Sequence, residues 1–133
     1  EGTTQLQVVA AIRYISNGTY LTIIKEMLEK EVAEELQPLK ARVVEMVKLY
    51  EQALEYVKEA QNQEMHDFLA RRLYNITAEI IMSLLILEDA TRSAELFAKS
   101  ANVYVRMAQA DVIGDHAYIM NFVKEDLPSF RAE

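Results

Sequence analysis

Apolar residues recur along most of the chain at alternating steps of three and four positions, which is the spacing of an amphipathic α-helix. The clearest stripe consists of Leu39, Val43, Met46, Tyr50, Leu54 and Val57. Charged residues fill the other side of this segment, so it should have one dry face and one wet face. We therefore predict a helix from Pro38, which suits a first helical turn, to about Gln61.

The same periodicity predicts three more long helices. One covers about 20–37 and stops before Pro38, because proline disfavours helical backbone in the preceding residue. Another covers about 64–87, and its second half is apolar nearly all round, so it should be the most buried helix. The last covers about 93–126, and Gly114 is expected to kink or end it. Its stripe is marked by Leu96, Val103 and Met107, with Phe97, Tyr104 and Ala108 beside it.

Polar and turn-forming residues predict the breaks between the helices. Residues 4–15 should form a short leading helix, which the Asn-Gly pair within residues 16–19 ends. The run EDATRS at residues 88–93 is interpreted as a connection. Pro128 is expected to end the ordered structure, so residues 129–133 should be a frayed tail.

Composition supports a helical protein of one domain. Only two prolines and three glycines occur in 133 residues, and 51% of the residues are hydrophobic. Such a chain has enough apolar side chains for a core and too few turn residues for a loop-rich β protein. We predict an all-α fold, an antiparallel four-helix bundle with a short leading helix.

Charge and cysteine content narrow the classes of partner. The formal net charge of −7 disfavours a nucleic-acid partner, because phosphate binding needs clustered Lys and Arg. The most apolar stretch, residues 80–87, is far shorter than the ~20 residues that span a bilayer, so we expect no membrane span. The absence of cysteine excludes disulfides and thiolate zinc sites. The absence of cysteine and of a secretory signal pattern is compatible with a cytoplasmic protein, and we take the cytoplasm as the default location.

Two polar patterns in the sequence are candidates for a metal or proton-transfer site. A carboxylate di-metal site needs Glu-x-x-His pairs, but Gln63 and Ile113 stand three positions before the two histidines, so no metal site is predicted. The run DVIGDH at residues 111–116 gathers two Asp and one His around a glycine, which is one pattern for a metal or proton-transfer site. A polar helix kink with solvated caps is the favoured interpretation, because no third helix offers an obvious converging partner.

The first seven residues, Glu-Gly-Thr-Thr-Gln-Leu-Gln, lead directly into the predicted leading helix. With Arg13 further along that helix, they resemble the Tyr-Glu-Gly-Thr-x-x-Ile-Gln signature near the end of the catalytic core of acyl-CoA dehydrogenases, with Leu6 in place of Ile. Residues 66–108 look similar to an additional helical domain that follows the core in some bacterial members. Val8 departs from the pattern, because many relatives carry Arg there.

The resemblance implies roles for the first five residues. Glu1 matches the catalytic base, which removes the α-proton of an acyl-CoA thioester while a β-hydride passes to flavin N5. Gly2 matches a position that lies against the substrate. Thr3, Thr4 and Gln5 match positions that approach FAD, where the polar start of a helix meets phosphate or ribose.

The resemblance also implies a division of the chain and a set of partners. Residues 1–19 would be the end of a dehydrogenase catalytic core with its hinge, and residues 20–133 a C-terminal helical bundle domain. The full-length parent would use FAD, an acyl-CoA substrate and electron-transfer flavoprotein, and would form a homo-oligomer. Because this chain has no strand pattern and no Gly-rich loop, we expect it alone to be inactive, to bind no FAD and to act in packing between domains or subunits.

Two other functions remain open from the residues themselves. The chain could be a stand-alone helical protein-interaction module with no enzymatic parent. Its partner surface would then be the third and fifth predicted helices, at about residues 38–61 and 93–126, which are amphipathic. An autonomous bundle enzyme ranks last, because neither a cofactor motif nor converging titratable groups are evident.

Overall fold

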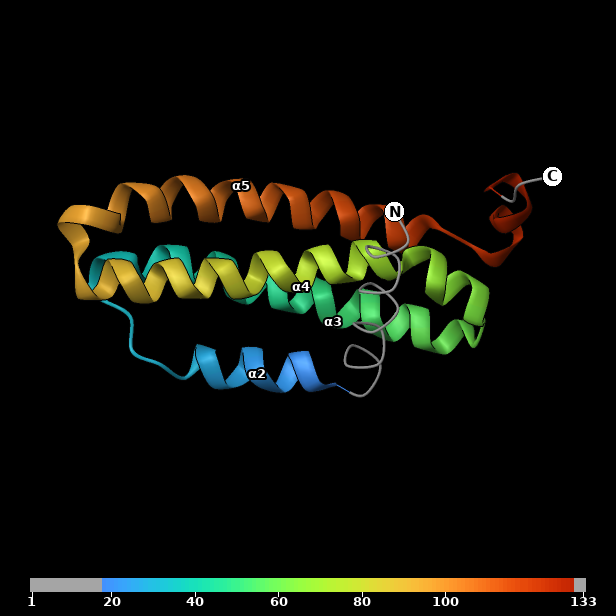
Figure 1. Ribbon diagram of the computed structural model, residues 1–133, viewed down its shortest axis with the longest axis horizontal. Coiled ribbons are helices and arrows are strands. Elements are labelled where there is room, and N and C mark those ends of the chain that lie inside the picture. The colour runs from blue at the N-terminus through green and yellow to red at the C-terminus, as the bar shows by residue number, and fades with distance from the viewer. Residues whose placement is uncertain (1–17, 131–133) are drawn as a thin grey trace, which may run out of the picture.

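The computed structural model describes residues 18–130, and every regular element in that range is helical. Three long helices run the length of the molecule, and a short one lies along its lower edge in Figure 1. The α-helices are α2 (Thr19–Leu28), α3 (Gln37–Ala60), α4 (Gln63–Arg92) and α5 (Ala94–Asn121), and the 3₁₀ helices are η1 (Glu34–Leu36) and η2 (Lys124–Phe130). The predicted all-α bundle is confirmed, with three long helices and one short helix.

The long helices alternate in direction because their connections are short. Residues 61 and 62 join α3 to α4, and Ser93 alone joins α4 to α5. Gln61 takes a left-handed conformation (φ 48°) that ends α3. The Asn62 side chain then accepts a hydrogen bond from the Met65 backbone N–H at 2.9 Å and caps α4. Local residues therefore set both the end of one helix and the start of the next.

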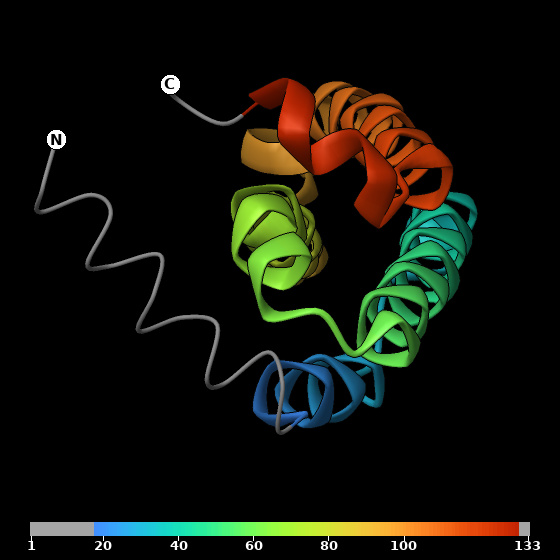
Figure 2. The same cartoon turned by 90° about the vertical axis from the view of Figure 1, so that its right-hand side faces the viewer.

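All four α-helices enclose one hydrophobic core, which Figure 2 shows in a view along the helices. The predicted stripe of α3 is buried at every position from Leu39 to Val57. The stripe of α4 is buried in the same way, from Met65 to Leu87. Ile24 of α2 closes the core from the side and is fully buried.

Helix α2 ends at Leu28, nine residues earlier than the sequence predicted. The following segment leaves the helix because it is held by contacts with the end of α4. The backbone N–H of Ala33 donates to the Thr91 hydroxyl at 3.2 Å, and Lys30 lies 3.2 Å from Glu88. These tertiary bonds replace the helical hydrogen bonds that the periodicity of residues 20–37 predicted.

The predicted connection at residues 88–93 is instead the last turn of α4, which continues to Arg92. Its charged residues pair along the helix, because Arg92 lies 3.6 Å from Glu88 and 2.7 Å from Asp89. Ala90 faces the core and is fully buried. Polar composition alone therefore does not indicate a connection here, because the charges of this run pair with one another on the exposed side of a helix.

Helix α5 passes through Gly114 without a break and ends at Asn121, earlier than predicted. Phe122 then takes an extended conformation and buries its ring, which turns the chain toward α4. Pro128 lies inside η2, so the ordered structure continues past it to Phe130. The Val123 backbone N–H donates to the Asp126 carboxylate at 3.1 Å and fixes the start of this segment.

The face of α5 that enters the core is not the one that the sequence marked. Leu96, Val103 and Met107 are 73%, 67% and 51% exposed. The buried positions are Ala101, Val105, Ala108, Val112 and Ile119. Alanine and valine occupy most of these buried positions, and the outer stripe is at least as hydrophobic, so hydrophobicity alone does not identify the buried side of the helix.

Candidate functional site

The site residues that the resemblance implies lie outside the described residues. They are Glu1, Gly2, Thr3, Thr4 and Gln5, and they remain predictions. The structure of residues 18–130 instead shows three other features: a polar cluster between α4 and α5, a hollow at one end of the bundle, and an exposed apolar face on α5.

The polar cluster is built from the DVIGDH run in the second half of α5. The Asp115 carboxylate lies 2.9 Å from Arg72 of α4 and is 16% exposed. The His116 imidazole lies 3.0 Å from the Gln52 side chain of α3. The favoured interpretation of a kink with solvated caps is therefore wrong, because α5 is continuous here and two other helices supply partners.

Glu79 of α4 faces this cluster and carries its most perturbed carboxyl group. Burial, a hydrogen bond with Asp111 and the negative charges of Asp111 and Asp115 raise the pKa of Glu79 to about 7. Its Oε2 atom is buried and accepts no hydrogen bond. Since two ionised carboxylates are both acceptors, Glu79 and Asp111 can share a hydrogen bond only when one of them holds a proton.

Arg72 joins the charged and aromatic parts of the cluster. Its guanidinium lies 3.6 Å from the centre of the Tyr118 ring while it pairs with Asp115. Burial raises the pKa of Asp115, and the Arg72 charge opposes that rise. Along residues 18–130, no group of three or more His, Asp or Glu side chains is arranged to hold a metal ion. The contacts fasten α4 to α5 and bring no nucleophile next to a base, so they suit a structural role.

An aromatic cluster fastens the chain beyond α5. The Phe68 ring stacks on Phe122 at 5.1 Å and contacts Phe130 at 5.0 Å between ring centres. Tyr118 stacks on Phe122 at 6.1 Å. These contacts explain why η2 remains ordered against α4 although proline and serine interrupt the helical pattern.

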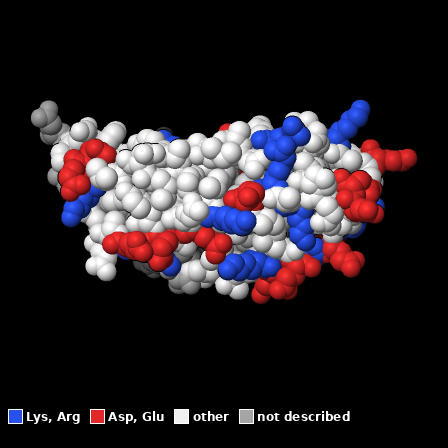
Figure 3. All heavy atoms as spheres, turned by 180° about the vertical axis from the view of Figure 1, so that it is seen from behind, with Lys and Arg blue, Asp and Glu red and all other residues white. Residues whose placement is uncertain are grey.

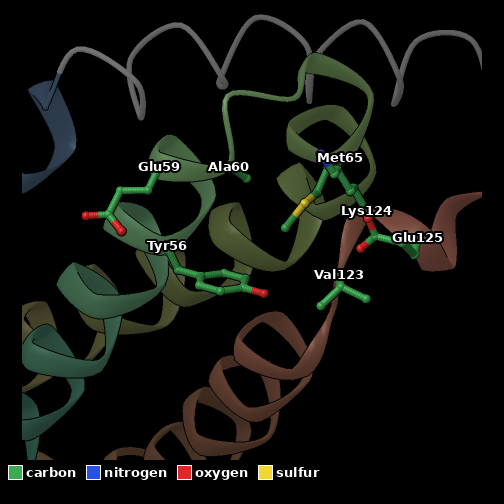
Figure 4. A pocket seen from close by; sticks show the side chains of 7 residues that line it. All are labelled: Tyr56, Glu59, Ala60, Met65, Val123, Lys124 and Glu125. Atoms are coloured by element: carbon green, nitrogen blue, oxygen red, sulfur yellow. The ribbon is translucent and has the colours of Figure 1, made fainter.

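A hollow of about 340 Å³ opens at the same end of the bundle (Figure 4). Tyr56, Ala60 and Met65 form one wall, and the segment from Val123 to Glu125 forms the other. The Tyr56 hydroxyl donates a hydrogen bond to the Phe122 carbonyl and joins α3 to the end of α5. The hollow is wide open, so it cannot exclude water from a bound reactant as a catalytic pocket must.

An exposed apolar face lies on α5, the helix to which the alternative of an interaction module assigned a partner surface. Ile86 of α4 and Val103, Tyr104 and Met107 of α5 line a shallow groove of about 430 Å³. The signal was present in the sequence, because Leu96, Val103 and Met107 had been identified as a stripe without any indication of what covers it.

Comparison with known families and structures identifies the chain. A sequence model described as the acyl-CoA dehydrogenase C-terminal domain matches residues 16–127. A crystal structure of an acyl-CoA dehydrogenase family protein from Porphyromonas gingivalis is similar, with 37% identity and a TM-score of 0.80. That match covers 86% of this chain and 98% of the other.

Two further results concern the class of protein. The comparison with curated proteins finds no match. Within residues 18–130, no helix combines the length and the apolar character needed to cross a membrane. The family match spans α2 to α5 and most of η2, and the solved relative shares their arrangement. This chain therefore belongs to the acyl-CoA dehydrogenase C-terminal domain family.

Proposed function

We propose that the chain is the C-terminal part of a FAD-dependent acyl-CoA dehydrogenase that oxidises the α,β bond of acyl-CoA thioesters. The observation that carries the proposal is the family match over residues 16–127, which eight residues separate from the Glu-Gly-Thr-Thr-Gln-Leu-Gln signature at residues 1–7. The signature and the helical domain stand in the order that the resemblance implies. In this proposal residues 1–19 end the catalytic core, and residues 20–133 form the helical domain.

The chemistry belongs to the signature segment. Glu1 is the base that takes the α-proton of the thioester, and its neighbour Gly2 leaves room for the substrate. Thr3, Thr4 and Gln5 contact FAD, which supplies the hydride acceptor when bound. A thioester α-proton is only weakly acidic, so Glu1 needs a desolvated setting and a polarised substrate carbonyl, both of which the catalytic core provides.

The helical domain has a structural role in this proposal. The grooves described along residues 18–130 are open surface features, and the contacts of the polar cluster, such as the Arg72–Asp115 pair, join α4 to α5 within the domain. We therefore assign no flavin contact to residues 20–133 and expect this chain alone to be inactive. In the parent enzyme the domain packs against the core or between subunits, and electrons leave to electron-transfer flavoprotein.

The test uses the longer polypeptide that contains this chain. We expect it to show flavin absorbance and to reduce a dye when acyl-CoA is added, whereas the 133-residue chain does neither. Glu1→Gln should lower acyl-CoA oxidation by about a thousandfold, the scale of a lost general base, and leave the flavin absorbance unchanged. Full activity in this variant would show that another residue is the base, and a longer polypeptide without flavin would overturn the proposal.

A second function has one observation in its favour. The exposed groove between α4 and α5 is an apolar surface of the kind that a helical interaction module uses. A stand-alone module would bind its partner through this surface without any flavin-containing parent. The absorbance measurement above separates the two functions.

A further inference from the structure

The outer face of α5 has its own row of residues at alternating steps of four and three, which is a heptad spacing. The row consists of Leu96, Ser100, Val103, Met107, Ala110, Gly114 and Ala117, and we call it the outer seam. The core positions of α5 lie one residue further along at Ala101 and Ala108, and two residues further along at Val105 and Val112. These steps average to a rotation of about 150° in an α-helix, so the outer seam points away from the core.

All seven residues of the outer seam are exposed. Figures 1 and 2 show α5 packed on α3 and α4, with no other described element along most of its opposite side. None of the seven is charged, in a protein whose net charge is −7. A regular apolar repeat that faces water along a whole helix is typical of a helix that packs on another helix.

The size of the side chains changes along the outer seam. The first half contains Leu96, Val103 and Met107 together with the smaller Ser100, and the second half contains only the small residues Ala110, Gly114 and Ala117. An antiparallel copy of the same helix would place its small half against this large half. We propose that the outer seam of α5 is the contact surface for a second copy of this chain, with the two α5 helices antiparallel.

The repeat predicts which residues meet. The outer seam alternates between positions that precede a step of four and positions that precede a step of three. In an antiparallel helix pair, a position of the first kind faces a position of the second kind in the partner helix. Leu96 then faces the partner's Gly114, and Ser100 faces the partner's Ala110. Val103 faces the partner's Met107, close to the two-fold axis. Each layer at the ends thus combines one larger and one smaller side chain, which lets the two helices stay close and straight.

A parallel pair fits less well. It would place Leu96 against the partner's Leu96 and Gly114 against the partner's Gly114, so the helices would be held apart at one end. Parallel pairing would bring Arg106 near the partner's Asp111, whereas antiparallel pairing brings the two Arg106 side chains near each other, where their long exposed chains can turn apart into water. The size gradient therefore decides for the antiparallel arrangement.

The available area is sufficient for a dimer when α4 takes part. The outer seam spans 21 residue steps, or roughly 32 Å, and a face two helices wide measures roughly 20 Å, so each partner offers about 640 Å². The total of about 1,300 Å² lies at the lower end of specific interfaces. Ile86 lines the groove beside Val103, and Met82 and Leu85 of α4 are 51% and 43% exposed. Figure 3 shows the opposite face, on the side of α3, where a broad area without charged side chains lies beside charged ones.

The first test measures molecular mass by sedimentation equilibrium over a range of concentrations of the 133-residue chain. We expect a reversible dimer, whose dissociation constant rises at least about tenfold in Val103→Asp and in Gly114→Leu, because one buries a charge and the other fills the space for the partner's Leu96. Asn102→Asp, exposed but off the outer seam, is the matched control and should change little. Gly114→Leu adds a better helix former, so its monomer should fold well.

A monomer at every concentration, or a dimer that neither seam variant weakens, would overturn the proposal. The second test determines the direction of the helices and uses the absence of cysteine from the chain. Leu96→Cys and Gly114→Cys, mixed and oxidised, should give a disulfide between the two variants. The same mixture with Asn102→Cys in place of Leu96→Cys should not. If Leu96→Cys alone forms the dominant disulfide, the helices are parallel and the proposal is wrong.

Discussion

The inner and outer faces of α5 have the same periodicity and opposite surroundings. Val105 on the inner face is fully buried, whereas Val103, only two residues earlier, is 67% exposed. The inner face packs Val105, Val112 and Ile119 on α3 and α4, whereas the outer face leaves Leu96, Val103 and Met107 in water. The comparison teaches that burial in this domain follows from the helices that are present as neighbours, and that an apolar stripe can also mark a surface still to be covered.

The largest effect on stability should come from replacing valine with aspartate on the inner face, compared with the same substitution on the outer face. Val105→Asp places an unpaired carboxylate in the core and should lower the free energy of unfolding by about 4 kcal/mol or more. Val103→Asp changes the monomer by less than about 0.5 kcal/mol, because its side chain remains in water. Urea denaturation at low protein concentration measures both. Equal losses in the two variants would show that the assigned faces of α5 are wrong.

The second prediction concerns the ion pair that ties the inner side of α5 to α4. Arg72→Met leaves the Asp115 carboxylate, 16% exposed, without its partner and removes the contact with the Tyr118 ring. The expected loss of stability is about 2 kcal/mol, since breaking a partly buried pair costs more than breaking a surface pair. Arg92→Met is the control. The Arg92 side chain is 68% exposed in its ion pairs, so this substitution should lower the free energy of unfolding by less than about 0.5 kcal/mol. The assignment fails if the two variants denature at the same urea concentration.

The third prediction uses the pH dependence of the cluster between α4 and α5. The pKa of Glu79 is raised to about 7, so the folded protein holds a proton that the unfolded chain releases at lower pH. Stability from this group is therefore present at pH 4 and is lost as pH rises toward 8. Glu79→Gln should remove that loss and be more stable than the wild type by about 1 kcal/mol at pH 8, with little difference at pH 5.

The measurement is thermal or urea unfolding at several pH values between 5 and 8. Glu59→Gln, an exposed residue of α3, serves as the control and should keep the wild-type slope. If Glu79→Gln also keeps that slope, the carboxyl group does not titrate in this range and its environment is more hydrated than the contacts indicate.

The smallest expected effect lies on the outer face. Gly114 sits in the interior of α5 with space around it, because an added Cβ would meet no atom within 4 Å. Gly114→Ala should stabilise the monomer by about 0.5 to 1 kcal/mol through better helix propensity. Ala101→Gly on the inner face is the inverse change and should destabilise by at least that amount, since it also opens space in the core. A destabilised Gly114→Ala variant would show that another surface already lies against Gly114.

Much of this protein was determined by the sequence alone. The periodicity of α3 and α4 was predicted and their apolar stripes are buried: α3 has one apolar and one charged face, so only one orientation keeps its charges in water, and the second half of α4 is apolar nearly all round. The all-α class follows from the scarcity of glycine and proline. The family was suggested by Glu1 to Gln7 and confirmed by the match over residues 16–127, whereas the roles of Glu1 to Gln5 remain predictions.

The tertiary structure decided what periodicity could not. Helix α2 stops at Leu28 because the next residues bond to the end of α4, and such partners are distant in sequence. The pairs Arg72–Asp115 and Glu79–Asp111 exist only because α4 and α5 lie side by side. Both faces of α5 satisfy the spacing of a helix, so only packing against α3 and α4 selects the inner one. The physical reason is that the spacing of apolar residues is set within one helix, whereas burial depends on which other helices lie against it.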